Sequence, residues 1–144
     1  MTRSVLSLAL VLLLVGPAAA QSEGCVFEKA PAREGHFGAL TLQSYGTRWE
    51  MLIETPDQAV TLDGSLFIDG ARQEARIEGG LDDMVVTVSD IPGTLDLTED
   101  LLDRLAGGYR LTVTATVDGA AASASYDLVG SRKAIEFMRE NCPG

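Results

Sequence analysis

The sequence contains few of the residues on which most catalytic and metal sites depend. It has one histidine, His36, and two cysteines, Cys25 and Cys142, among 144 residues. The G-x-S-x-G, H-E-x-x-H, Walker and G-x-G-x-x-G patterns are absent, as is any Cys or His spacing typical of zinc sites. We therefore predict no enzyme activity, no catalytic residue, no cofactor and no metal ion.

Positive charge is also scarce. The chain has 11 Lys and Arg against 21 Asp and Glu, which gives a net charge of −10. Nucleic acids and anionic membrane surfaces bind proteins through basic patches. A chain of this composition is not expected to bind nucleic acid, or to insert into a membrane once it is mature.

One apolar run, the eleven residues Val5–Val15, is the longest in the sequence. It is too short to span a hydrocarbon core of about 30 Å. It follows Arg3 and precedes an A-x-A motif at Ala18–Ala20. These features predict that residues 1–20 are a signal peptide, cleaved before Gln21, which exports the protein to the periplasm. An uncleaved membrane anchor is the alternative, and the shortness of the run disfavours it.

Residues 21–144 have the length of one domain, and the two cysteines lie near its ends. Exported proteins fold in an oxidising compartment, and two cysteines allow one intramolecular pairing. A Cys25–Cys142 bridge would stabilise the fold by about 4 to 5 kcal/mol in the chain-entropy model. A catalytic thiol is the alternative, and it would need a nearby base such as His36. We predict a structural disulfide.

Alternation of apolar and polar residues dominates the predicted domain. It is clearest over residues 109–117, where one face is expected to carry Tyr109, Leu111, Val113, Ala115 and Val117. Asp118-Gly119 suits a type I′ turn, and residues 122–128 alternate again, which predicts a hairpin. Similar patterns predict strands at residues 38–42, 49–53, 59–62, 65–68, 71–77 and 84–89, with a turn at Asp69-Gly70. About eight short strands favour a mainly β fold, an antiparallel sandwich or barrel.

Two short helices interrupt this pattern. The first is expected to begin with Thr98 as its cap and to end at Gly107-Gly108. The second, at the C-terminus, is expected to begin with Ser131 as its cap and to keep Arg139 exposed. Its predicted buried face carries Ala134, Ile135, Phe137 and Met138, and the spacing directs Cys142 toward that same face.

Several acidic groups could in principle act in a site. Asp82 with Asp83, or Glu50 with Glu54, could form the carboxylate pair of a glycosidase. Adjacent strand residues point to opposite faces, and the two glutamates lie on a polar face, so we interpret all four as solvated charges. Residues 79–83 are similar to one calcium-binding turn repeat, but such cages need tandem copies.

The sequence combines a leader, the early Cys25, a run of short strands, the LDRLAGG segment of residues 102–108 and the terminal YDLVGSRKAIEFMRENC. In this combination it resembles the invasion-associated locus B family of exported proteobacterial proteins. Residues 98–142 carry most of the resemblance. It implies a periplasmic or cell-surface all-β domain, linked in one lineage to host-cell entry, with no established enzyme activity and no catalytic residues to assign.

These observations predict a non-enzymatic accessory or protein-binding domain of the periplasm, whose partner is another envelope protein. The alternative is a carrier of a small, lipid-like molecule inside a barrel. The side chains that line a lipid pocket and those of a packed core are of the same types, so the sequence leaves this alternative open.

Overall fold

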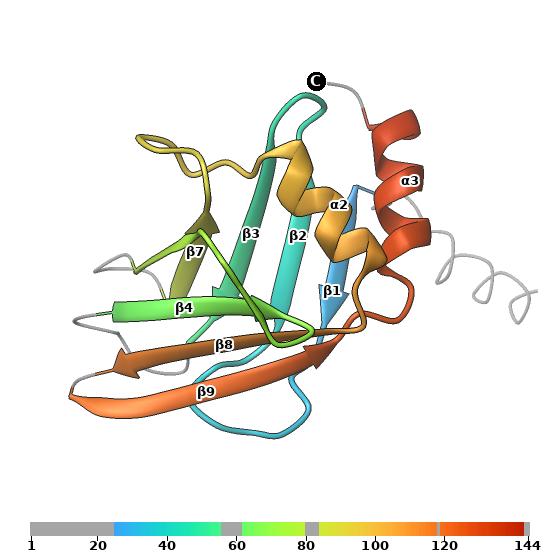
Figure 1. Ribbon diagram of the computed structural model, residues 1–144. Coiled ribbons are helices and arrows are strands. Elements are labelled where there is room, and N and C mark those ends of the chain that lie inside the picture. The colour runs from blue at the N-terminus through green and yellow to red at the C-terminus, as the bar shows by residue number, and fades with distance from the viewer. Residues whose placement is uncertain (1–24, 56–61, 80–83, 118, 143–144) are drawn as a thin grey trace, which may run out of the picture.

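Nine short strands pair into two antiparallel sheets in the computed structural model, which describes residues 25–55, 62–79, 84–117 and 119–142 (Figure 1). The predicted signal peptide and the Asp82-Asp83 pair lie outside these residues. In chain order the elements are β1 (Val26–Lys29), β2 (Leu40–Ser44), β3 (Trp49–Glu54), β4 (Leu62–Ile68), β5 (Ala71–Gln73), β6 (Arg76–Gly79), β7 (Val85–Ser89), α2 (Glu99–Gly107), β8 (Arg110–Val117), β9 (Ala120–Asp127) and α3 (Ser131–Asn141).

The predicted mainly β, antiparallel fold is confirmed. One sheet has the order β1-β2-β3-β7-β6 and the other the order β5-β4-β8-β9. In Figure 1 the strands of the first sheet run across those of the second, as in sandwiches with crossed sheets. Over the described strands, two separate sheets form instead of one closed barrel.

The prediction of one strand over residues 71–77 is wrong, because the chain changes sheets within it. β5 ends at Gln73 and β6 begins at Arg76, and these strands belong to different sheets. Gln73 and Ile77 are both buried, so the apolar-polar alternation continues through the bend. A strand that turns a corner between two sheets keeps the same face inward, and the alternation alone does not reveal the corner.

Gly64 explains why β4 can lie close to β6 at this corner. A Cβ atom at this position would be 2.8 Å from Ile77 Cδ1 and 3.0 Å from the Thr114 carbonyl oxygen. A side chain would therefore push the strands apart. The sequence analysis placed a break between two predicted strands here, whereas β4 is continuous over Leu62–Ile68.

The turn at Asp69-Gly70 is confirmed, and both residues have positive φ angles, 51° and 84°. The Asp69 carboxylate also accepts hydrogen bonds from the backbone N–H groups of Tyr109 and Arg110. These bonds hold Tyr109 just before β8, where its side chain is 80% exposed. The prediction that Tyr109 faces the core is therefore wrong, while Leu111 and Val113 do so as expected.

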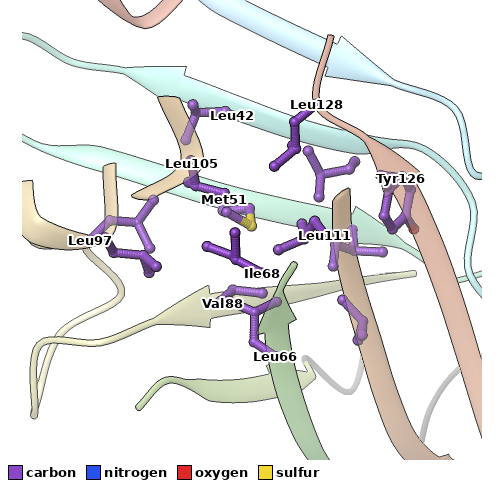
Figure 2. Packing of buried hydrophobic residues seen from close by; sticks show 14 of the residues in the cluster. Leu42, Met51, Leu66, Ile68, Val88, Leu97, Leu105, Leu111, Tyr126 and Leu128 are labelled. Carbon is purple, nitrogen blue, oxygen red and sulfur yellow. The ribbon is translucent and has the colours of Figure 1, made fainter. Parts of the chain in front are cut away.

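Apolar side chains from both sheets and both helices fill the space between the sheets (Figure 2). The largest fully buried side chains include Trp49 and Met51 of β3 and Tyr126 of β9. The Tyr126 hydroxyl donates a hydrogen bond of 2.7 Å to the Gly38 carbonyl oxygen. Burial and the nearby Glu54 carboxylate raise the pKa of Tyr126 well above its usual range.

The two helices lie next to each other at one end of the sheets (Figure 1). The predicted cap of α2 is confirmed, since Thr98 Oγ1 accepts a hydrogen bond from the Leu101 N–H. The predicted cap of α3 is wrong. Gly130, with a φ of 89°, occupies the cap position, and no side chain caps the helix. Ser131 is instead the first helical residue, and its buried hydroxyl donates to the Leu105 carbonyl oxygen.

The buried face of α3 is narrower than predicted. Ile135 and Met138 are buried as expected, but Phe137 is 50% exposed. Successive helical residues are about 100° apart around the axis, so Phe137 lies on the far side from Ile135. The exposed Arg139 forms ion pairs with Glu99 and Asp103 of α2.

The predicted disulfide between Cys25 and Cys142 is confirmed, with the two Cα atoms 5.7 Å apart. Cys142 is buried and follows Met138 by four residues, at the C-cap position just after α3. The bridge joins the start of β1 to the end of α3, and such covalent links are typical of proteins from oxidising compartments.

Candidate functional site

Among the described candidate residues, no ion pair joins His36 to Glu50 or Glu54. His36 is exposed in the segment between β1 and β2. Glu50 and Glu54 both lie in β3, four residues apart, which is roughly 13 Å along a strand. Glycosidase carboxylates lie about 5 to 9.5 Å apart, so this pair is too widely spaced for that chemistry. No group of three or more His, Cys, Asp or Glu suited to a metal ion occurs among the described residues.

Several surface clefts in the described part of the chain lie along the two opposite edges of the four-stranded sheet. One edge is formed by β9 and the other by β5. The space between the two sheets is occupied by core side chains, such as those labelled in Figure 2. We therefore describe the two edges as the candidate sites.

The β9 edge, residues 120–127, carries no charged side chain before its last residue, Asp127. Residues 120–125 are alanines and serines. The Ser125 carbonyl oxygen accepts a hydrogen bond of 2.8 Å from the Ala32 N–H, a group outside the sheet. Backbone groups alternate in direction along a strand, so those of Ala121 and Ser123 point away from β8 as well. No described residue forms a backbone hydrogen bond with them on that side.

Two hollows flank the β9 edge. One, of about 370 Å³, is lined by residues of β8 and β9 that include Thr114, Ala121 and Ser123. The other, of about 480 Å³, lies between β9 and residues 32–34 and is also lined by Arg110. The small side chains of β9 leave this space on either side of the strand.

The β5 edge carries a cluster of guanidinium groups that we call the arginine cleft. Arg72 of β5 and Arg76 of β6 line a cleft of about 600 Å³ at the corner between the sheets. An adjoining cleft of about 530 Å³ is lined by Arg72 and by Arg104 of α2. Glu74 and Asp90 line both clefts. Three arginines from three elements thus converge in an acidic chain that has 11 Lys and Arg in all.

Hydrogen bonds fix two of these arginines. Gln73, which is 8% exposed, accepts a hydrogen bond of 3.1 Å from Arg104 Nη1 at its Oε1 atom. Arg76 donates to Ser89 Oγ and to the Thr94 carbonyl oxygen, and it also pairs with Glu78. Within the described parts of the chain, neither Arg72 nor Arg104 has a carboxylate at ion-pair distance.

The carboxylate of Asp90 is engaged elsewhere. It accepts hydrogen bonds from the backbone N–H of Thr98, at 2.7 Å, and from the hydroxyl of the same residue. Asp90 thus helps to hold the start of α2, and it forms no ion pair with an arginine of the described residues. Glu74 and Asp100 remain as exposed acidic groups that line the arginine cleft.

The sequence analysis identified neither edge as a site. The uncharged run of residues 120–126 is visible in the sequence, but the strand order that leaves it at an edge is not. Arg72 of β5 and Arg104 of α2 are separated along the chain by β6 and β7. They meet through the change of sheet after β5, which the alternation does not reveal.

No helix of the described residues is long and apolar enough to cross a membrane. The chain was compared with protein-family models, with curated proteins and with solved structures, and none of the three comparisons found a match.

Proposed function

We propose that this chain is an exported, non-enzymatic domain that binds another protein by taking up an extended segment of it along β9. The resemblance of residues 98–142 to the invasion-associated locus B family and the disulfide support a setting in the periplasm or at the cell surface. The partner is then another protein of the envelope. The observation that carries this proposal is the hydrogen bond between Ala32 and Ser125.

That hydrogen bond supports strand addition because an added strand would bind β9 through bonds of the same kind, from its peptide N–H groups to outward carbonyl oxygens of β9. A peptide N–H from outside the sheet already occupies one acceptor on the β9 edge. The backbone groups of Ala121 and Ser123 continue this row toward the β8–β9 turn. An extended segment placed there would form main-chain hydrogen bonds, as in proteins that recognise peptides by β-augmentation.

The composition of β9 also supports a binding edge. Many proteins protect an exposed edge with lysine, proline or an inward-pointing charge, which prevents another strand from pairing with it. Residues 120–126 have none of these. Their small side chains and the hollows on either side leave room for the side chains of an added strand.

The occupant that fits this edge is an uncharged, extended segment of a different protein. A second copy of this chain would bring another net charge of −10 to the interface. Repulsion between two such copies opposes self-association. A neutral or basic partner does not meet this repulsion.

The test compares two substitutions at one position. Ser123→Pro removes an outward N–H while leaving the β8 ladder intact, and proline is tolerated on edge strands. Ser123→Thr keeps the N–H and serves as the matched control. Each immobilised protein is incubated with an extract of the cells that express it, and the captured proteins are identified by mass spectrometry. Hydrogen exchange then measures protection of the Ala121 and Ser123 amides in the purified complex.

We expect a partner that the unmodified protein and Ser123→Thr capture equally and that Ser123→Pro loses at least tenfold. The amides of Ala121 and Ser123 should become protected in the complex. Equal capture by Ser123→Pro, or protection confined to other elements, contradicts the proposal. Light scattering gives a further contradicting outcome. If the unmodified protein is a homodimer and Ser123→Pro is a monomer, the β9 edge binds a second copy of the chain and not a different protein.

A further inference from the structure

We infer that the arginine cleft is a second binding site, which takes a small organic anion bearing carboxylate or phosphate groups. The site lies at the β5 edge, across the four-stranded sheet from β9, and so goes beyond the proposed binding of an extended segment. It is built from Arg72, Arg76 and Arg104.

The size of the cleft fits a small molecule. Its two adjoining parts have volumes of about 600 Å³ and about 530 Å³. Sites for small ligands usually measure roughly 300 to 1,000 Å³. The cleft lies where the chain leaves one sheet and enters the other, so backbone from both sheets and α2 forms its walls.

The donor groups of the arginines favour an anion, whereas the charges that line the two clefts balance, with Glu74, Asp90 and Asp100 beside the three arginines. Arginine presents a planar fork of N–H donors that matches a carboxylate or a phosphate. Arg72 and Arg104 keep this capacity, because no described carboxylate lies at ion-pair distance from either of them. The Asp90 carboxylate accepts its hydrogen bonds from Thr98, so it keeps its charge but forms none of these bonds with an arginine.

Gln73 gives the site a preformed part. Its side chain is more than nine-tenths buried, accepts the hydrogen bond from Arg104 and donates one of 2.8 Å to the Ala71 carbonyl oxygen. The amide of Gln73 therefore fixes Arg104 without neutralising its charge. A glutamate at this position would keep the contact with Arg104 and neutralise the positive charge of the guanidinium group. A guanidinium group that is already held in place loses less conformational freedom when a ligand binds.

Glu74 and Asp100 limit which anion fits. Both are exposed and line the same cleft as Arg72 and Arg104. They repel groups that extend beyond the arginines and favour a compact ligand. Citrate, succinate and inorganic phosphate are suitable probes, because together they separate carboxylate from phosphate recognition and small from larger ligands.

The experiment measures binding of citrate, succinate and inorganic phosphate to the mature protein by calorimetry at low salt. We expect at least one of the three to bind with a Kd of 1 mM or tighter. Arg72→Gln and Arg104→Gln should each weaken that binding at least tenfold. Arg132→Gln, which removes an exposed arginine of α3, is the matched control and should leave it unchanged. Gln73→Glu should weaken binding as strongly as Arg104→Gln, although the protein stays folded.

Absence of binding by all three probes overturns the inference. Equal losses in Arg132→Gln and Arg104→Gln also overturn it, because they would show attraction to any surface cation. Capture of a partner at β9 should be the same in Arg72→Gln as in the unmodified protein. The two proposals can therefore fail separately.

Discussion

The hydroxyl group of Ser131, at the start of α3, donates a 2.7 Å hydrogen bond to the Leu105 carbonyl oxygen in the last turn of α2. The last carbonyl groups of a helix have no partner within the helix and need one from elsewhere. Here a single buried side chain supplies it. The bond joins two helices that are also linked on the surface by the ion pairs of Arg139.

We predict that Ser131→Ala lowers the free energy of unfolding by about 1 to 3 kcal/mol, because a buried carbonyl group loses its partner. Ser123→Ala, at an exposed serine, should change it by less than about 0.5 kcal/mol. Urea unfolding followed by circular dichroism measures both values. Equal values for the two variants would show that the contact contributes nothing.

The exposure of Phe137 predicts a contrast between neighbouring residues of α3. Met138→Ala empties a buried position and should lower the free energy of unfolding by about 2 to 5 kcal/mol. Phe137→Ala should lower it by less than about 1 kcal/mol, because that side chain is half exposed. The same urea series compares them. A larger loss for Phe137→Ala would mean that α3 packs with a different face inward.

The disulfide predicts a large difference between oxidised and reduced protein. The double variant Cys25→Ser with Cys142→Ser should unfold with a free energy lower by about 4 to 5 kcal/mol, the chain-entropy value for a loop of this size. Thiol titration of the unmodified protein, denatured without reductant, should detect no free thiol. Two titratable thiols would contradict the pairing.

The buried Tyr126 hydroxyl predicts a loss of stability at alkaline pH. Its pKa is raised in the folded protein, so above about pH 10 the unfolded chain loses a proton that the folded protein keeps. The free energy of unfolding should then fall by about 1.4 kcal/mol per pH unit for this one group. The free energy of unfolding of Tyr126→Phe should fall less steeply with pH over the same range. Parallel slopes from pH 9.5 to 11 would contradict the assignment.

The predicted export of the protein has its own test. The mature chain should begin at Gln21, because cleavage is expected after the A-x-A motif at Ala18–Ala20. Mass spectrometry of the protein purified from the periplasm measures the mass of the intact chain. A mass that includes residues 1–20 would contradict the signal peptide.

Local signals in the sequence predicted most of the described strands, the Asp69-Gly70 turn and both helices, whereas Asp118 of the predicted Asp118-Gly119 turn lies outside the described residues. The Asp69-Gly70 turn and the Thr98 cap depend on a few neighbouring residues, which is why each was found. β1 was missed, since its sequence, Val26-Phe27-Glu28-Lys29, does not alternate apolar and polar residues. Phe137 was misplaced because its apolar character was taken as a sign of burial, although its angle around the helix differs from that of Ile135.

The candidate sites depend on contacts that local patterns do not contain. Whether β9 is an edge strand follows from the order of the strands, which is fixed by the packing of the whole chain. Arg72 and Arg104 meet because the chain turns from one sheet to the other and α2 returns to that corner. Gln73 lies in a predicted strand, and the sequence pattern there gives no sign that its side-chain amide binds Arg104.

The bond between Cys25 and Cys142 also has a mechanical consequence. It encloses the nine described strands and two described helices between residues that are 117 positions apart in sequence and 5.7 Å apart at their Cα atoms. A pulling force applied at these two residues is carried by the covalent bond, and the sheets between them bear no tension. Without the bond, a stretch of this length could extend by roughly 400 Å at about 3.4 Å per residue. The oxidised domain therefore behaves under tension as a short, inextensible link whose folded surface, including the β9 edge, keeps its shape.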